Sequence, residues 1–415
     1  MINLGEKIKQ LRKARKMTLA DVAGDKLSKG MLRLIENGKA QPSMESLQHI
    51  AKQLGIDVSE LMQTGEVNEI RELYKQVEAL RLAINNEYVK EKYMQLYQNL
   101  LDLIEPYVKE GKLKGQTYEE VSLYETYVVM RNRLKIDEST DVYYDIIQMY
   151  EKVHAYSKIL NVYSRLAIYE FEKRAYEAAL DVLIEAEKYV DKYDHLIGVL
   201  EKLDLYYNIT VMYAAINENE KAENYLEMAL TIAKEKKVIY RLNDFYRFLF
   251  VSYCEEDNVE KAKYYLDKIH AMTSILEDPI ELYVEQLLTL FYINSIEKDY
   301  EKTIATTFDQ SFLPEEVYAD SNHFFHGEYG YAYWKLGRFE EALEQLKHIR
   351  MPEQNHHPID LVRLYRSYAI RALCYFEIGD IENAKRDILY AVDGVKDLKD
   401  LYDKKFIQEA FQKIM

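Results

Sequence analysis

The sequence has little glycine or proline, with 14 and 6 residues among 415. Turns and strand edges need these residues, and ordinary proteins contain roughly 12% of the two together. Their scarcity favours long helices joined by short turns, and it argues against a β-sandwich, a barrel or a long disordered tail. An apolar content of 48% beside 30% charged residues fits a chain with a substantial core.

Long hydrophobic runs are also absent. No segment approaches the ~18 uninterrupted apolar residues that a membrane-spanning helix needs. The first residues, MINLGEKIKQLRKARK, carry charges throughout and do not resemble a signal peptide. Only two cysteines occur, Cys254 and Cys374, so no disulfide framework is expected. We therefore expect a cytoplasmic protein without membrane contact.

The motifs of common catalytic and cofactor sites are missing as well. There is no GxxxxGK[ST] loop, no GxGxxG, no HExxH and no paired CxxC. The only close histidine pairs are His323 with His326 and His356 with His357, whereas a metal site needs three or four converging ligands. We expect no cofactor, no metal and no enzymatic activity, and we expect both cysteines to be small buried hydrophobic residues.

Charge is distributed unevenly along the chain. Residues 1–63 hold 11 basic and 7 acidic residues, a net charge of +4, and the rest of the chain has a net charge of −20. A basic head on an acidic body indicates that only the head meets a polyanion such as DNA.

The head reads as a series of short helices. Apolar residues at helical spacing predict a helix over 4–14. Thr18 and Asp21 form a capping box for a second helix. Ser28 is expected to cap a third helix, and Gly38 to end it in a left-handed turn.

A fourth helix begins after Pro42-Ser43 and ends at Gly55, and a short fifth helix follows. Short helices with a tight turn between the second and third predict a helix-turn-helix DNA-binding domain over residues 1–63. The alternative is a five-helix core whose charges serve only solubility.

The sequence of this head resembles that of the lambda-repressor-like (Xre/Cro) class. The segments that carry the resemblance are LGEKIKQLRKARKMTLADVA and LSKGMLRLIENGKAQPSMESLQHIAKQLG. Leu19 stands where that class commonly has glutamine, and the turn between the helices is one residue shorter. The resemblance implies that the third helix enters the major groove. It also implies a set of DNA-contacting residues: Thr18, Lys29, Gly30, Met31, Arg33, Asn37 and Lys39.

The body repeats a short pattern in which a turn is followed by a small anchor residue. The anchors are spaced by 43, 40, 41, 39 and 42 residues, and they are Ala179, Ala222, Ala262, Thr303, Ala342 and Ala384. Nine residues before the anchor, four of six copies have tyrosine; twelve before it, four have a small residue. Each copy therefore predicts a helix, a tight turn and a second helix that contains the anchor.

This pattern, clearest in YAYWKLGRFEEALEQL, resembles a tetratricopeptide repeat with lengthened helices, since the usual period is ~34 residues. We predict an all-α protein in which residues 64–69 form a linker and 70–397 a right-handed superhelical repeat domain. The repeat domain is expected to bind a peptide and to dimerise, and residues 398–415 are expected to form a capping helix.

The first helices of stacked pairs line the concave face of such a superhelix. Positions 18, 15, 14 and 11 before each anchor share one helix face, and in this sequence they are rich in amide, hydroxyl and charged groups. These groups suit an extended peptide, with the arginines meeting a terminal carboxylate or an acidic side chain. The alternative is an ordinary solvated groove. The candidate peptide-binding residues are Asn161, Ser164, Arg165, Asp204, Tyr207, Asn208, Asp244, Arg247, Glu285, Thr289, Tyr292, Tyr331 and Arg366.

The combination of head and repeats resembles the RRNPP family of peptide-pheromone receptors, and the segment LSKGMLRLIENG resembles its Rgg branch in particular. The resemblance implies a cytoplasmic homodimer that binds double-stranded operator DNA and a short signalling peptide in quorum sensing. Two other hypotheses stay open. In one, the repeats dock a protein partner; in the other, the body is a phosphatase, although no catalytic constellation supports this.

Overall fold

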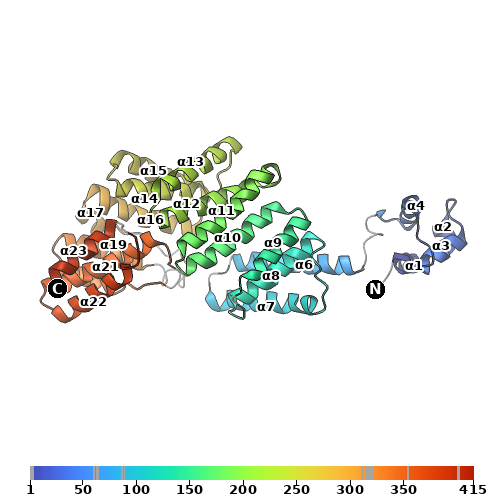
Figure 1. Ribbon diagram of the computed structural model, residues 1–415, viewed down its shortest axis with the longest axis horizontal. Coiled ribbons are helices and arrows are strands. Elements are labelled where there is room, and N and C mark those ends of the chain that lie inside the picture. The colour runs from blue at the N-terminus through green and yellow to red at the C-terminus, as the bar shows by residue number, and fades with distance from the viewer. Residues whose placement is uncertain are drawn as a thin grey trace. The chain divides into compact units, whose positions relative to one another are not determined.

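The computed structural model describes residues 4–58, 61, 65–85, 87, 89–137, 139–309, 313, 322–352, 355–399 and 402–415. Every regular element in these ranges is a helix (Figure 1), which confirms the all-α prediction. The chain divides into two compact units, residues 1–142 and 143–415. No helix in the described ranges is both long enough and apolar enough to cross a membrane.

The first unit contains the head and three longer helices. The head helices are α1 (Leu4–Ala14), α2 (Leu19–Ala23), α3 (Lys29–Glu36) and α4 (Met44–Leu54). They surround a buried cluster that includes Ile8, Leu32 and Ile50. After them come α6 (Gly65–Asn85), α7 (Lys90–Lys109) and α8 (Tyr118–Arg133), which pack against one another.

The helix ends predicted in the head are confirmed. The Thr18 side chain accepts a hydrogen bond from the Asp21 amide, and Asp21 accepts one from the Thr18 amide, so the capping box is complete. Ser28 caps α3 by accepting from the Met31 amide at 3.0 Å. Gly38 has a φ of +68°, the left-handed conformation expected where α3 ends.

The predicted linker differs from the structure. Residues 65–69 are helical because α6 begins at Gly65. No glycine or proline interrupts residues 66–85, so nothing in the local sequence stops the helix there. Residues 62–64 lie outside the described ranges.

The second unit is built from successive helix pairs (Figure 1). It opens with α9 (Asp141–Lys152), which begins just before the unit boundary, and it ends with α23 (Tyr402–Ile414), which packs on the last pair through Ile407 and Ala410. The paired helices between them are α10 (Tyr156–Glu172) with α11 (Tyr176–Tyr193), α12 (Val199–Ala215) with α13 (Asn219–Lys236), α14 (Leu242–Glu255) with α15 (Val259–Leu276), α16 (Pro279–Tyr292) with α17 (Tyr300–Ala305), α19 (His323–Lys335) with α20 (Phe339–Leu346), and α21 (Pro358–Glu377) with α22 (Ile381–Val395). Short helical turns η1 (Asp194–Leu196) and η2 (Ile293–Glu297) follow α11 and α16.

All six predicted anchors lie in second helices and are fully buried, with 0% exposure: Ala179, Ala222, Ala262, Thr303, Ala342 and Ala384. Five residues before each anchor, the turn contains one residue with positive φ: Arg174, Asn217, Asp257, Lys298, Gly337 and Gly379. In five pairs the next amide donates to the carbonyl of the residue nine before the anchor, as Glu218 does to Tyr213 at 2.9 Å. The repeated tyrosines therefore mark the residue whose carbonyl closes the turn.

The fourth pair departs from this rule. Its turn is closed by the Asp299 amide and the Ile293 carbonyl at 3.4 Å, one residue further back than in the other pairs. The cause is η2, a π-helical turn that adds a residue before the turn.

The small residues predicted twelve positions before the anchor lie where two helices approach closely. Thr210, Gly330 and Ala372 are all buried. A Cβ atom added to Gly330 would lie 2.5 Å from Cγ and Cδ2 of Leu346 in α20. Glycine at this position lets α19 and α20 come together.

We expect Gly330→Val to lower the free energy of unfolding by about 1–3 kcal/mol, because the added methyl groups overpack this contact. A matched substitution, Gly30→Val, meets only the Ser28 hydroxyl, at 3.9 Å, and should change stability by less than about 0.5 kcal/mol. Denaturant unfolding of both variants checks this. Equal stability of the two variants would contradict the proposed close approach.

Candidate functional site

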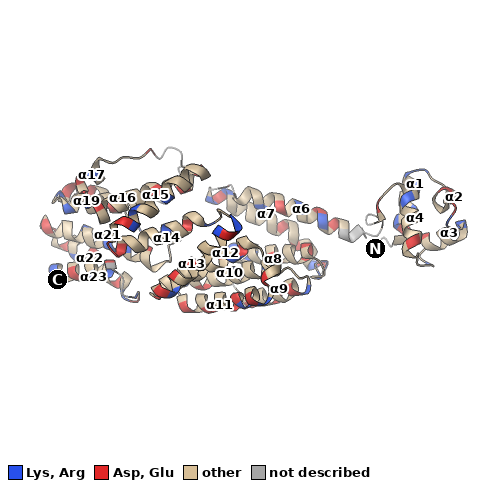
Figure 2. Cartoon of the chain, turned by 90° about the horizontal axis from the view of Figure 1, so that it is seen from above, with Lys and Arg blue, Asp and Glu red and all other residues tan. Residues whose placement is uncertain are grey.

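The exposed face of α3 carries the residues predicted to meet DNA. Leu32 and Ile35 point into the head core, with 0% and 2% exposure, while the opposite side of the helix is open. Lys and Arg residues are also visible on α1 (Figure 2). All seven predicted residues are exposed: Thr18, Lys29, Gly30, Met31, Arg33, Asn37 and Lys39.

A largely buried ion pair, not predicted from the sequence, holds α3 against α1. Arg12 Nε donates to Glu36 Oε1 at 2.6 Å, and Arg12 Nη2 donates to Glu36 Oε2 at 2.8 Å. Arg12 Nη1 also donates to the Met17 carbonyl at 3.0 Å, and Glu36 is only 5% exposed. The partners are 24 residues apart, so no local spacing rule reveals them.

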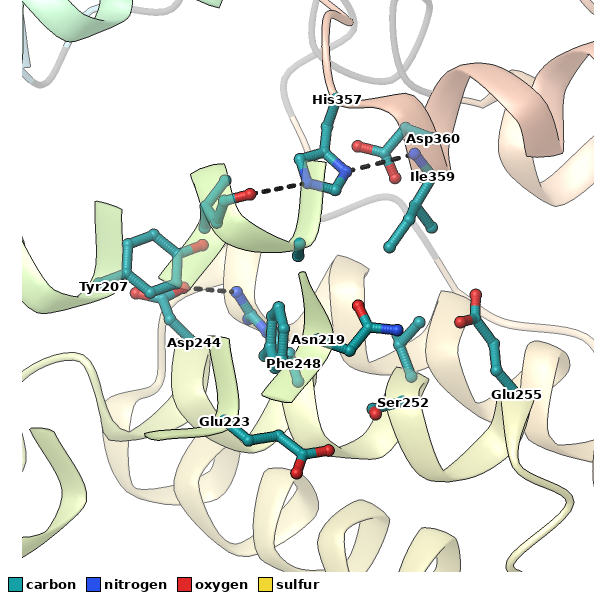
Figure 3. A pocket seen from close by; sticks show the side chains of 14 residues that line it. Tyr207, Asn219, Glu223, Asp244, Phe248, Ser252, Glu255, His357, Ile359 and Asp360 are labelled. Carbon is teal, nitrogen blue, oxygen red and sulfur yellow. Dashed lines mark hydrogen bonds and ion pairs between the residues drawn. The ribbon is translucent and has the colours of Figure 1, made fainter. Parts of the chain in front are cut away.

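In the second unit, a cavity of about 310 Å³ lies among α12, α13, α14 and the start of α21 (Figure 3). Three predicted groove residues line it: Tyr207, Asp244 and Arg247. Burial, followed by the nearby Asp244 carboxylate, raises the pKa of Tyr207 to about 12. The Tyr207 hydroxyl therefore stays protonated at neutral pH and is able to donate a hydrogen bond to a ligand.

Further lining residues were missed although their positions carried a signal. Val211, Phe248 and Val251 stand at the same offsets from their anchors as the predicted polar residues, and they line the cavity. The predicted peptide-binding residues at those positions included only polar and charged side chains, so these three were left out. His357 and Asp360 could not be found in this way, since they belong to a distant repeat.

The charged side chains beside the cavity form a chain of ion pairs. Arg241 contacts Asp204 at 2.7 Å and Asp244 at 2.9 Å. Arg247 contacts Asp244 at 3.4 Å and also pairs with Glu281. The Arg247 guanidinium, which was predicted to meet a ligand carboxylate, is therefore already paired with two carboxylates of the protein.

At the first pairs, the predicted residues Asn161 and Ser164 are half-buried and Arg165 is exposed. The structure joins α10 to α12 through a hydrogen bond from Asn208 Nδ2 to Ser164 Oγ at 3.3 Å. This contact bridges neighbouring repeats on the predicted face.

At α16, Glu285 lies 3.0 Å from His270 Nε2, and the Thr289 hydroxyl donates to the Glu285 carbonyl at 2.9 Å. This pairing raises the pKa of His270, chiefly through the hydrogen bond to Glu285. Tyr292 packs in the apolar core between α14 and α16, close to Phe250.

Tyr331 and Arg366 line a second cavity of about 300 Å³. Arg366 is 8% exposed and donates to Glu328 Oε1 at 3.0 Å and to Asp403 Oδ1 at 3.3 Å. Asn294 also donates to Glu328, at 2.8 Å. Arg366 therefore links α19, α21 and α23 within a buried polar network.

Both cysteines are buried in first helices, as expected, and burial raises the pKa of each thiol to about 12. Within the described ranges, no group of three or more His, Cys, Asp and Glu side chains is placed to hold a metal ion.

Residues late in the second unit contact residues near its start, close to the cavity. The Tyr176 hydroxyl donates to the His356 carbonyl at 2.7 Å. Lys399 Nζ donates to the Ile216 carbonyl at 3.0 Å and lies 3.3 Å from Glu177. These contacts join α11 and α12 to the segments on either side of the last helix pair.

His357 follows His356 in this junction and lines the cavity (Figure 3). Its Nε2 lies 3.4 Å from the Val211 carbonyl, and its Nδ1 lies 3.3 Å from the Ile359 amide, which it caps at the start of α21. Only the neutral ring protonated on Nε2 satisfies both partners. Desolvation lowers the pKa of His357, an effect that the neighbouring Asp360 opposes.

Comparison with known proteins identifies the head. Residues 8–61 match the helix-turn-helix family. No curated protein sequence matches the chain.

Similar solved structures include three helical proteins. Bacillus thuringiensis PlcR in complex with the peptide PapR7 and DNA is 17% identical, covers 66% of this chain and 99% of its own, and has a TM-score of 0.38. A tetratricopeptide repeat protein from Parabacteroides merdae is 15% identical, covers 77% and 98%, and has a TM-score of 0.39. The Streptococcus dysgalactiae SHP pheromone receptor Rgg2 is 14% identical, covers 57% and 94%, and has a TM-score of 0.28.

We expect the His357 junction to weaken as the pH falls. The pKa of His357 is lowered in the folded protein, so the folded junction favours the neutral ring. The junction is therefore intact at a pH above the ordinary histidine range. At about pH 5, protonation of the ring favours opening of the junction. Hydrogen exchange over residues 355–361, corrected for intrinsic rates, should therefore be faster at about pH 5 than at a pH above the ordinary histidine range. His357→Gln, which keeps a donor and an acceptor without titrating there, should remove most of the change. Equal protection at both pH values in the unsubstituted protein would contradict the assignment.

Proposed function

We propose that this chain is a sequence-specific transcriptional regulator, acting in the cytoplasm as a homodimer, whose DNA binding is controlled by a short signalling peptide. The head binds operator DNA, and the peptide occupies the cavity lined by Tyr207, Asp244 and Arg247. The proposed role is one of binding and regulation without enzymatic activity. The observation that carries it is a helix-turn-helix head joined to a repeat unit with a lined cavity.

The DNA-binding half rests on the family match and on the exposed face of α3. In helix-turn-helix domains the second helix of the motif lies in the major groove, with its N-terminal residues at the base edges. Lys29, Gly30, Met31 and Arg33 occupy that part of α3 and are exposed. One such head reads only a few base pairs, so we infer a dimer on two half-sites about one helical turn apart.

The ligand-binding half rests on the size and position of the cavity. A volume of about 310 Å³ falls at the lower end of the ~300–1,000 Å³ range of small-ligand sites. It suits a few side chains of a short peptide better than the broad surface of a folded protein. Its walls come from consecutive repeats and from α21, whose start is more than a hundred residues away in the chain.

This placement gives the ligand a means of control. A peptide that touches both α14 and the start of α21 binds the closed junction more tightly than an open one, and it therefore shifts the equilibrium between the two. Such coupling is typically worth ~1–3 kcal/mol and is reciprocal, so operator DNA changes peptide affinity by the same factor.

The role of α3 is tested by substituting Arg33. We expect Arg33→Ala to weaken binding to an operator selected from random DNA by about 1–3 kcal/mol, and to lower the slope of log affinity against log salt by about one if Arg33 contacts a phosphate. Fluorescence anisotropy at several salt concentrations measures both. Lys52→Ala, an exposed substitution on α4, is the control and should retain most affinity. A larger loss for Lys52→Ala than for Arg33→Ala would contradict the assignment of α3.

The ligand is tested by hydrogen exchange of the full chain with a peptide-enriched extract of the source organism's culture supernatant. We expect protection over residues 204–211, 244–255 and 357–360, which line or adjoin the cavity. Protection caused only by a macromolecular fraction would favour a protein partner instead. An extract that contains the peptide and protects none of these segments would refute the proposed site.

A further inference from the structure

The cavity proposed to hold the ligand has an excess of negative charge in its walls. Four carboxylates line it, those of Glu223, Asp244, Glu255 and Asp360, against the single guanidinium of Arg247. His357 adds no positive charge at neutral pH, because desolvation lowers its pKa. The electrostatic character of the site is set by how these groups are paired.

The arginine is already used within the protein. Arg247 pairs with Asp244 and with Glu281, and Asp244 pairs in addition with Arg241. A ligand carboxylate approaching Arg247 would have to compete with two protein carboxylates. The wall is therefore a poor receptor for an anion.

The other three carboxylates are not neutralised in this way. Glu223, Glu255 and Asp360 line the cavity without a salt bridge to any described residue, although Lys261 interacts electrostatically with Glu223 and Arg363 with Glu255. They come from α13, α14 and α21 and surround the cavity on different sides (Figure 3). The enclosing walls desolvate Glu255 and raise its pKa, although Arg363 opposes this shift.

Apolar side chains lie beside these carboxylates. Val211, Phe248, Val251 and Ile359 line the same cavity. A ligand that fills it therefore meets acidic groups and an apolar wall together. Neither an anion nor a wholly apolar group matches that combination.

We propose that the peptide bound in this cavity carries a positive charge, either a Lys or Arg side chain or a free amino terminus, next to an apolar residue. The positive group faces Glu223, Glu255 and Asp360, and the apolar residue packs on Phe248 and Val251. This inference rests on the proposed function, since it names the chemistry of the ligand at the same site.

The test uses the full-length protein and four synthetic peptide pools. All are hexapeptides with Ala, Val, Leu, Ile or Phe at five positions. Three pools have Lys, Glu or Gln fixed at the sixth position and both termini blocked. The fourth pool has Gln and a free amino terminus. Equilibrium dialysis with mass spectrometry measures retention. We expect at least tenfold more retention of the Lys pool or of the free-amine pool than of the blocked Gln pool, and least retention of the Glu pool. Comparing the Lys pool with the free-amine pool distinguishes a side chain from the chain terminus.

Two triple variants connect the preference to this cavity. Glu223→Gln with Glu255→Gln and Asp360→Asn should remove it. A control with equal loss of charge, Glu235→Gln with Glu260→Gln and Glu409→Gln, changes exposed residues of α13, α15 and α23 and should preserve it. Circular dichroism and unfolding midpoints show that both variants are folded.

The outcomes separate this inference from the proposed function. Retention of the Gln or Glu pool equal to that of the cationic pools would overturn the inference while leaving peptide binding intact. A cationic preference that survives in the cavity variant would place the charge recognition elsewhere and also overturn it. Failure of the wild-type protein to retain any pool would contradict the proposed peptide function as well.

Discussion

The repeat unit depends on how closely the two helices of each pair can approach at one small residue. Each anchor has 0% exposure, and five residues before it the backbone enters the left-handed region. Three of these six turn residues, Arg174, Asp257 and Lys298, are neither glycine nor asparagine. The other three are Asn217, Gly337 and Gly379, of the two types that tolerate this conformation best. A left-handed conformation costs a residue with a Cβ roughly 1–2 kcal/mol, so packing around the anchor compensates for that cost.

The inner faces of neighbouring helix pairs must also fit one another, and ion pairs between charged side chains help to hold them together. Asp204 pairs with Arg241, Arg247 with Glu281, and Glu328 with Arg366. Each pair spans 34–38 residues, close to one repeat. Of these, the pair of Glu328 with Arg366 is buried, so removing one partner leaves a buried charge without compensation and is strongly destabilising. The polar inner face is therefore part of the structure as well as a surface open to ligands.

Much of the fold was readable from local patterns. The anchor spacing predicted every helix pair from α10 to α22, and Thr18, Ser28 and Gly38 marked helix ends correctly, because capping and turn conformation depend on residues a few positions apart. The start of α6 was not anticipated, since residues 64–69 were predicted to be a linker, whereas the backbone is helical from Gly65 onward. The candidate site was predicted less completely. The spacing within the repeats predicted that Tyr207, Asp244 and Arg247 share a face, and all three line the cavity. The ion-pair partner of Arg247, Glu281, lies in the next repeat, and no short-range pattern in the sequence indicates it.

The return of the chain to its own first repeats explains why the cavity differs from its predicted character. His356 and His357 lie between α20 and α21, where they contact Tyr176 and Val211 of much earlier helices. Asp360, at the start of α21, thereby joins a wall that already contains Glu223 and Glu255. The arginines of this face were expected to meet a ligand carboxylate, because each side chain was considered without its partner in the next repeat. Ion pairs between repeats neutralise Arg247, whereas Glu223, Glu255 and Asp360 line the cavity without a salt bridge to any described residue. The charge presented to a ligand is thus determined by which groups the repeat packing leaves unpaired, and that depends on the closed arrangement of the unit.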